Sequence, residues 1–118
     1  MKLYRRVFVP NPSFRFDPEE LSNLAETVVY VSDMPMFDNL IGDEHVHRFE
    51  YRIADRMDDF DPNEDIIAYY GDSMIFAMMV MYLSDNFDAF DIARFSSKKQ
   101  GYIIREVSYA KFIRQEQE

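Results

Sequence analysis

The chain has 118 residues, a formal net charge of −9 and no cysteine. A chain of this length forms one domain, and without cysteine it has neither disulfides nor a thiolate metal site. Its hydrophobic fraction of 47% and aromatic fraction of 16% exclude a disordered acidic protein, which would lack the aromatic residues.

The whole net charge lies in one segment, residues 33–72. This segment holds twelve carboxylates against three arginines, whereas acidic and basic residues balance on either side of it. A field of one sign confined to one region repels nucleic acid and anionic lipid, and it attracts a basic partner. We therefore expect no direct binding to nucleic acid or to a membrane.

The first residues lack the apolar stretch and cleavage site of a signal peptide. The longest apolar run, residues 74–83, is about half of the ~20 residues that cross a bilayer. Both features predict a soluble cytoplasmic protein.

The first third of the chain predicts a strand, a short helix and a second strand. Residues 3–9 predict a strand that ends at Pro10, and Asp17-Pro18 is a strong helix start that predicts a helix ending near Glu26. The β-branched run 27–31 predicts a buried strand.

Apolar residues at spacings of three and four predict the next helix after a loop at residues 33–42. They are Val46, Phe49, Ile53, Met57 and Phe60. Residues 65–70 then predict a second buried strand. Asp72 predicts the cap of a helix that ends near Asn86, and this helix is apolar nearly all round, so we expect it to be covered on several sides.

Residues 90–95 and 102–109 predict two strands joined by a polar turn at 96–101, and residues 115–118 are expected to fray. The order is therefore β-α-β-α-β-α-β-β. It predicts a single small α/β domain over residues 1–118, with a mixed, mostly parallel sheet and a C-terminal antiparallel hairpin.

Two aspartates end predicted parallel strands, Asp33 and Asp72. Ligands bind at the carboxyl ends of such strands, so these residues could bind a small ligand, a nucleotide or a metal, and Gly71 would allow close approach of the backbone. Capping by Asp72 and a turn at Asp33 explain the same residues without a ligand. Both readings stay open.

Metal binding and catalysis have less support. His45 and His47 lie two residues apart on a helix and cannot chelate together, while Asp43, His47 and Glu50 have a suitable spacing that a solvated helix start explains equally well. No serine stands in a nucleophile elbow. We expect no metal, no cofactor and no catalytic residues, although an enzyme is not excluded.

Two further groups of side chains receive structural explanations. Four methionines in residues 74–81 are expected to fill the core, although methionine clusters also form adaptable binding surfaces. Four basic side chains in the hairpin are expected to protect an exposed strand edge from aggregation. They are Arg94, Lys98, Lys99 and Arg105.

The last fifty residues carry a resemblance. The strand Asp65-Ile-Ile-Ala-Tyr-Tyr-Gly71-Asp72, the apolar helix after it and the hairpin Phe90–Phe95 with Gly101-Tyr102 resemble small uncharacterised α/β proteins of tailed bacteriophages. This chain departs from that group in its helix, which has Met and Phe where the group favours Ala and Gly. The resemblance implies a phage origin and a place in the infected bacterial cytoplasm, where small acidic proteins commonly bind and block host machinery.

Solubility alone would explain the acidic segment, and so would imitation of a nucleic-acid backbone. Because the charge is confined to one segment, we expect it to dock a basic protein surface of a host or defence protein, for example a nucleic-acid-binding one. The expected docking residues are Asp43, Glu44, Asp55, Asp58, Asp59, Asp61, Glu64 and Asp65. The leading prediction is a non-enzymatic interaction protein that modulates or inhibits its partner. The alternative is a small-ligand or metal-binding domain that uses Asp33, Gly71 and Asp72, and a homo-oligomer is open in either case.

Overall fold

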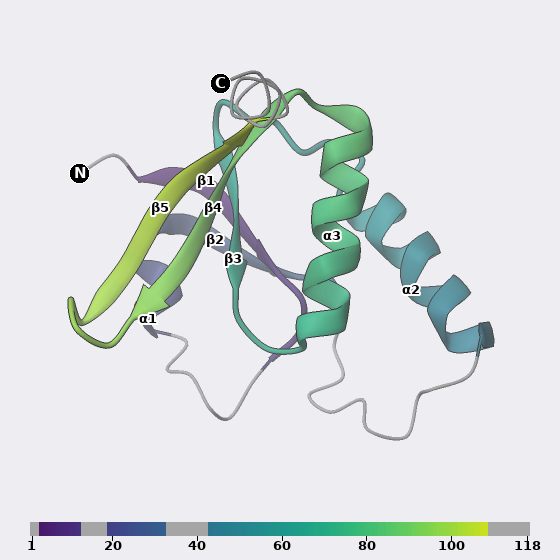
Figure 1. Ribbon diagram of the computed structural model, residues 1–118, viewed down its shortest axis with the longest axis horizontal. Coiled ribbons are helices and arrows are strands. Elements are labelled where there is room, and N and C mark those ends of the chain that lie inside the picture. Colours follow the sequence, from purple (N-terminus) through teal and green to yellow (C-terminus); the bar gives the residue numbers. More distant parts are fainter. Residues whose placement is uncertain (1–2, 13–18, 33–42, 109–118) are drawn as a thin grey trace, which may run out of the picture.

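A computed structural model describes residues 3–12, 19–32 and 43–108 of the chain, and Figure 1 shows the arrangement of its strands and helices. The elements are β1 (Tyr4–Val9), α1 (Glu19–Ser22), β2 (Ala25–Tyr30), α2 (Asp43–Arg56), β3 (Asp65–Tyr69), α3 (Ser73–Asn86), β4 (Ala89–Ser96) and β5 (Gly101–Ser108). The predicted α/β class and the predicted order of elements are confirmed.

The strands form one five-stranded sheet in the order β2-β1-β3-β4-β5. The first four are parallel, and β5 runs antiparallel to β4. The register places Arg6 of β1 opposite Asp65 of β3, and Ile67 of β3 opposite Ile92 of β4. The first residues of β1 and β3 thus lie side by side at the same end of the sheet, although β2 and α2 separate the two strands in the sequence.

Each face of the sheet has its own apolar core, because side chains alternate along a strand. On one face, Val7, Ile66 and Ala68 pack with Leu21 of α1. On the other face, Phe8 and Ile67 pack with buried residues of α2 and α3. Figure 1 shows α3 and α2 next to each other on the same side of the strands. The two long helices therefore share one side of the sheet.

Two expectations for the first third of the chain need correction. Helix α1 ends at Ser22 instead of near Glu26, and β2 begins at Ala25. Strand β2 is also not fully buried, since Glu26 and Thr27 are exposed. The reason is its place in the sheet: β2 is an edge strand, and the short helix α1 covers only part of it.

Helix α3 is less buried than its composition predicts. Only one stripe of it is buried, formed by Ile75, Met79 and Leu83. Met74 and Met81 are 66% and 71% exposed on the opposite side. The helix packs against the sheet on one face and against α2 on a flank, so its outer apolar side chains face solvent.

The hairpin has the predicted geometry. Strand β4 ends at Ser96, β5 begins at Gly101, and Phe95 and Tyr102 contact each other edge to face across the pair, 5.7 Å between ring centroids. Strand β5 lies at the edge of the sheet, as the protective basic residues predict. Within the described part of the chain, no helix is long and apolar enough to span a membrane.

Candidate functional site

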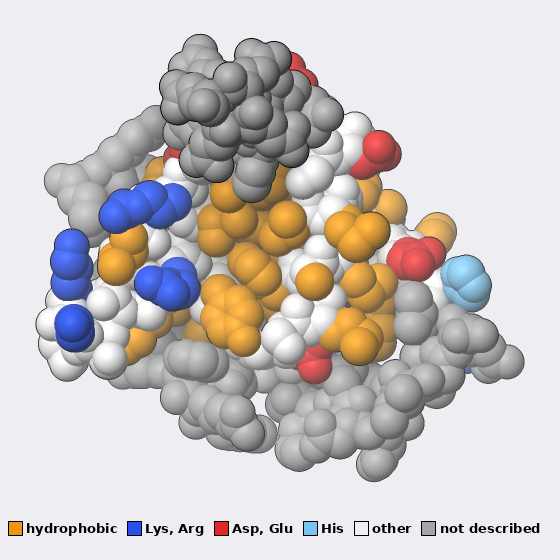
Figure 2. Space-filling model, in the orientation of Figure 1, with side chains coloured by type: hydrophobic (Ala, Val, Ile, Leu, Met, Phe, Trp, Pro, Cys, Tyr) orange, Lys and Arg blue, Asp and Glu red, His pale blue; other side chains and the backbone are white. Residues whose placement is uncertain are grey.

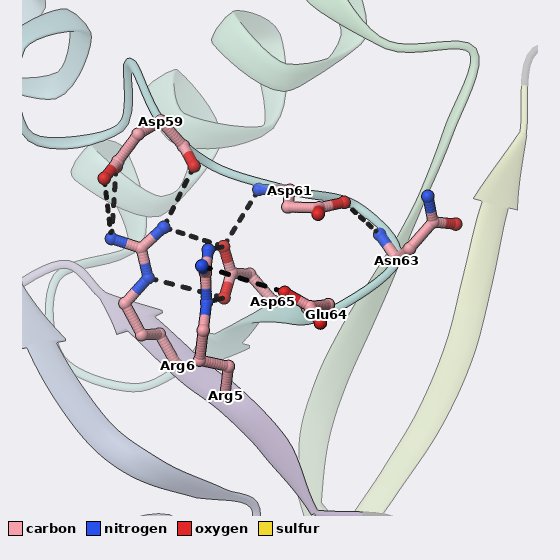
Figure 3. Close-up of polar contacts among 7 residues, drawn as sticks. All are labelled: Arg5, Arg6, Asp59, Asp61, Asn63, Glu64 and Asp65. Atoms are coloured by element: carbon pink, nitrogen blue, oxygen red, sulfur yellow. Dashed lines mark hydrogen bonds and ion pairs between the residues drawn. The ribbon is translucent and has the colours of Figure 1, made fainter.

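Four of the predicted docking acids belong to one network of intramolecular polar contacts. The network joins the turn before β3 to two arginines at the start of β1, as Figure 3 shows. Its members are Arg5, Arg6, Asp59, Asp61, Asn63, Glu64 and Asp65. The contacts form because β1 and β3 are neighbouring parallel strands, so their first residues lie at the same end of the sheet.

Asp65 is the centre of this network, and its side chain is fully buried. Arg5 donates to both carboxylate oxygens, over 3.2 and 2.9 Å, and Arg6 does the same over 3.4 and 2.9 Å. The backbone amide of Asp61 adds a further hydrogen bond of 2.9 Å. Five donors thus converge on one carboxylate.

These contacts decide the charge of Asp65. Burial by itself would raise the pKa of Asp65, but the hydrogen bonds from the two arginines and from one backbone amide outweigh burial and hold that pKa below its usual value. Asp65 is therefore charged at neutral pH and fully paired.

The other acids of this turn are also engaged. Arg6 donates to both carboxylate oxygens of Asp59, over 3.1 and 3.2 Å, and to its carbonyl. Asp61 accepts from the amide of Asn63, and Glu64 lies 3.7 Å from Arg5. The expectation that Asp65 belongs to a docking face is therefore wrong, because it is buried. Asp59 is partly neutralised by Arg6 and Glu64 by Arg5, while Asp61 accepts a backbone hydrogen bond.

Helix α2 carries the three arginines of the acidic segment together on its surface. Arg48, Arg52 and Arg56 recur every four residues, so they form one exposed stripe along the helix. Asp55 and Asp58 are exposed, as a docking role requires. The side chains of Asp43 and Glu44 lie outside the described residues.

The carboxyl edge of the sheet was the alternative site, and its residues have partners within the chain. Asp72 caps α3, where its carboxylate accepts a hydrogen bond of 3.0 Å from the amide of Ile75. Its own amide donates to the buried Asn11 side chain over 2.7 Å. Gly71 has a positive φ of 88°, and Asn11 occupies the space where a Cβ would lie. The close approach that Gly71 allows is therefore to Asn11.

Strand order also weakens the proposed carboxylate pair. Asp33 lies outside the described residues, but β1 stands between β2 and β3, so the ends of these two strands are two strand spacings apart, about 9.6 Å. A site shared by the ends of β2 and β3 would be expected if these strands were neighbours, but β1 separates them.

Capping by Asp72 has a measurable consequence. We expect Asp72→Ser to change the free energy of unfolding by less than about 1 kcal/mol, since serine caps nearly as well as aspartate, and Asp72→Ala to cost about 1 kcal/mol. Chemical denaturation measures both variants. Equal stability of the serine and alanine variants would contradict the capping role.

A groove between α2 and α3 combines acidic and apolar side chains. It has a volume of about 420 Å³ and is lined by Glu50, Ile53, Met78, Met81, Tyr82 and Asp85. Glu50 and Asp85 are exposed and come from different helices, whereas Ile53 is buried. Methionine side chains adapt to irregular surfaces, so the apolar lining can take partners of different shape. The sequence alone could not predict this groove, because its lining comes from two helices whose contact is not visible in the sequence.

Metal ligands do not gather in the described residues. No group of three or more His, Cys, Asp or Glu side chains in the described ranges could hold a metal ion. His47 lies 3.5 Å from Glu50, one turn along α2, and this contact is an ion pair when the imidazole is protonated.

No protein-family model, curated protein or solved structure matches the chain.

Proposed function

We propose that the protein is a non-enzymatic interaction protein that binds a basic, amphipathic segment of a partner protein in the groove between α2 and α3. The observation that carries the proposal is the composition of the groove. Exposed Glu50 and Asp85 stand beside Met78 and Met81, so the groove offers negative charge and apolar surface together.

A basic amphipathic helix matches both features. Its apolar side chains replace water on the methionines, as in other helix-in-groove complexes, and its lysines and arginines pair with the acids. The net charge of −9 adds long-range attraction, which speeds the encounter with a basic partner. The proposal keeps the predicted basic partner but moves the binding residues from the predicted docking acids between Asp43 and Asp65 to the groove.

The resemblance to phage proteins suggests the cellular setting. We propose a phage origin, action in the cytoplasm of the infected bacterium, and inhibition or modulation of a host or defence protein whose basic segment enters the groove. The partner class is a protein that exposes a basic amphipathic helix, as many nucleic-acid-binding proteins do.

The test measures binding of a synthetic basic amphipathic peptide by titration calorimetry. We expect Glu50→Lys and Asp85→Lys each to weaken binding roughly fivefold, because each replaces an attraction at the rim with a repulsion. Binding should also weaken as salt rises, since exposed charges are screened over about 8 Å at physiological ionic strength.

Glu26→Lys is the matched control. It makes the same change in net charge but lies exposed on β2, at the edge of the sheet opposite the hairpin. It should alter the affinity by less than about twofold, because its effect acts only through the overall field. Equal losses for Glu26→Lys and Glu50→Lys would mean that net charge alone attracts the peptide, and the groove would not be the site.

The same variants identify the natural partner in a bacterial lysate. A true partner is retained by the unmodified protein and by Glu26→Lys, lost with Glu50→Lys, and released by salt. A protein that is retained by all three binds elsewhere.

A further inference from the structure

Among the described residues, no helix covers the β4–β5 hairpin on the side of the sheet where α2 and α3 pack. Ile92, Ile103 and Val107 of the hairpin point to this side and are only half-buried. Together with Arg94 and Arg105 they line a hollow of about 300 Å³. Within the described part of the chain, α3 reaches the neighbouring strands but leaves this hollow open.

Charge changes sign across this side of the molecule. Figure 2 shows Lys and Arg side chains over the hairpin, apolar side chains in the middle, and acidic side chains toward α3 and α2. The basic end carries Arg94 and Arg105, which are both exposed. The acidic end carries Glu50 and Asp85 at the rim of the groove.

The same side also has a step in height. Helix α3 packs on the sheet and so lies one layer above the strands that it covers, and its outer residues Met74 and Met81 are the exposed apolar side chains described above. Beside it, the uncovered hairpin is one layer lower. A raised apolar helix and a recessed apolar sheet surface thus lie next to each other on one face.

A face with these properties is complementary to itself. Consider a twofold axis that lies in the plane of the face and runs parallel to α3. Rotation about it places the basic end of one copy on the acidic end of the other, and the raised helix of each copy over the recessed hairpin of the other. Twofold interfaces of this isologous kind are the commonest in homo-oligomers.

We infer that the protein forms a twofold homodimer through this face, with α3 of each copy covering the β4–β5 hairpin of the other. Arg94 and Arg105 of one copy meet Glu50 and Asp85 of its partner, and Met74 and Met81 lose their contact with water. The inference deepens the proposed function and rests on it for the role of the groove. The acidic rim that receives a basic partner is occupied in the dimer, so self-association and partner binding exclude each other.

The test is charge reversal at both ends of the face. Sedimentation equilibrium should show that the unmodified protein passes from monomer to dimer as its concentration rises. The double variants Arg94→Glu/Arg105→Glu and Glu50→Lys/Asp85→Lys should each be monomeric, because like charges then face each other. An equimolar mixture of the two variants should dimerise again, since both halves of the interface become attractive.

Circular dichroism and the melting temperature establish that each variant is folded. If one of them fails to fold, the neutral variants Arg94→Gln/Arg105→Gln and Glu50→Gln/Asp85→Gln replace it, and each should weaken the dimer. A monomeric unmodified protein at every concentration overturns the inference. So does a dimer that persists in both double variants, or a mixture that stays monomeric.

Peptide binding separates this inference from the proposed function. Arg94→Glu/Arg105→Glu leaves the groove intact, so it should bind the basic peptide at least as well as the unmodified protein, which must first dissociate. Peptide binding without any dimer overturns only the dimer. A dimer that forms without measurable peptide binding overturns only the proposed partner.

Discussion

Asp65→Asn should lower the free energy of unfolding by about 3 kcal/mol, because removing the buried partner of an ion pair leaves the mostly buried Arg6 with only the exposed Asp59 to balance its charge. The side chain of Asp65 is fully buried, and that of Arg6, which donates to it, is 18% exposed. Asparagine keeps the shape of the side chain but cannot balance the positive charge. Urea denaturation at neutral pH measures the loss.

Asp58→Asn is the matched control, since Asp58 is an exposed acid of the same turn. It should change the free energy of unfolding by less than about 0.5 kcal/mol. Equal effects of the two substitutions would show that Asp65 contributes only to the overall charge and not through its contacts with the arginines.

The pH dependence of stability gives an independent check. The pKa of Asp65 is held below its usual value, so the stabilisation is complete above the unfolded-state pKa of about 3.9 and is lost as the pH falls below it toward the folded-state pKa. The free energy of unfolding of Asp65→Asn should therefore fall less steeply between about pH 4 and pH 2 than that of the unmodified protein. Parallel curves would contradict the lowered pKa.

Gly71→Ala should lower the free energy of unfolding by about 2–4 kcal/mol. The positive φ of 88° alone costs an L-residue about 1–2 kcal/mol. In addition, an added Cβ would lie 2.3 Å from Asn11 Oδ1 and 2.7 Å from the Asn11 carbonyl oxygen, so the buried Asn11 must move. That movement breaks the hydrogen bond from Asp72 to Asn11 and loosens the start of α3.

Gly101→Ala provides the comparison for Gly71. At Gly101 the nearest atom to an added Cβ is the Lys99 carbonyl oxygen at 3.9 Å, an ordinary contact. We expect a change within about 1 kcal/mol of either sign, because alanine also restricts the unfolded chain. If Gly71→Ala were equally mild, Gly71 would not be required by the approach of Asn11, and the idea of a ligand near it would regain support.

The sequence by itself determined the class of fold and most of its elements. Alternation of strand and helix patterns predicted a mostly parallel sheet with a terminal hairpin, because parallel strands require helical crossovers. Local chemistry was enough to place the cap at Asp72, the buried Ile53 of α2 and the buried Met57 directly after that helix. These features depend on neighbours within a few residues along the chain, where spacing and composition carry the information.

The sequence did not determine which surfaces are free. Net charge along the chain predicted an acidic docking face at residues 43–65, but Arg5 and Arg6 partly neutralise the end of that segment from about sixty residues away. Charge counted in a sequence window includes only local partners. The pairing became visible once β1 and β3 were known to be neighbours, with β2 on the far side of β1.

Only the tertiary structure decided which side of α3 is exposed and what lies beside it. The helix is apolar nearly all round, so its sequence has no polar stripe to indicate the solvent side. Packing against one face of the sheet and one flank of α2 left Met74 and Met81 exposed and brought Glu50 close to Asp85. The groove and the step beside it arise from how helices and strands are stacked, and stacking is set by long-range contacts that no local pattern specifies.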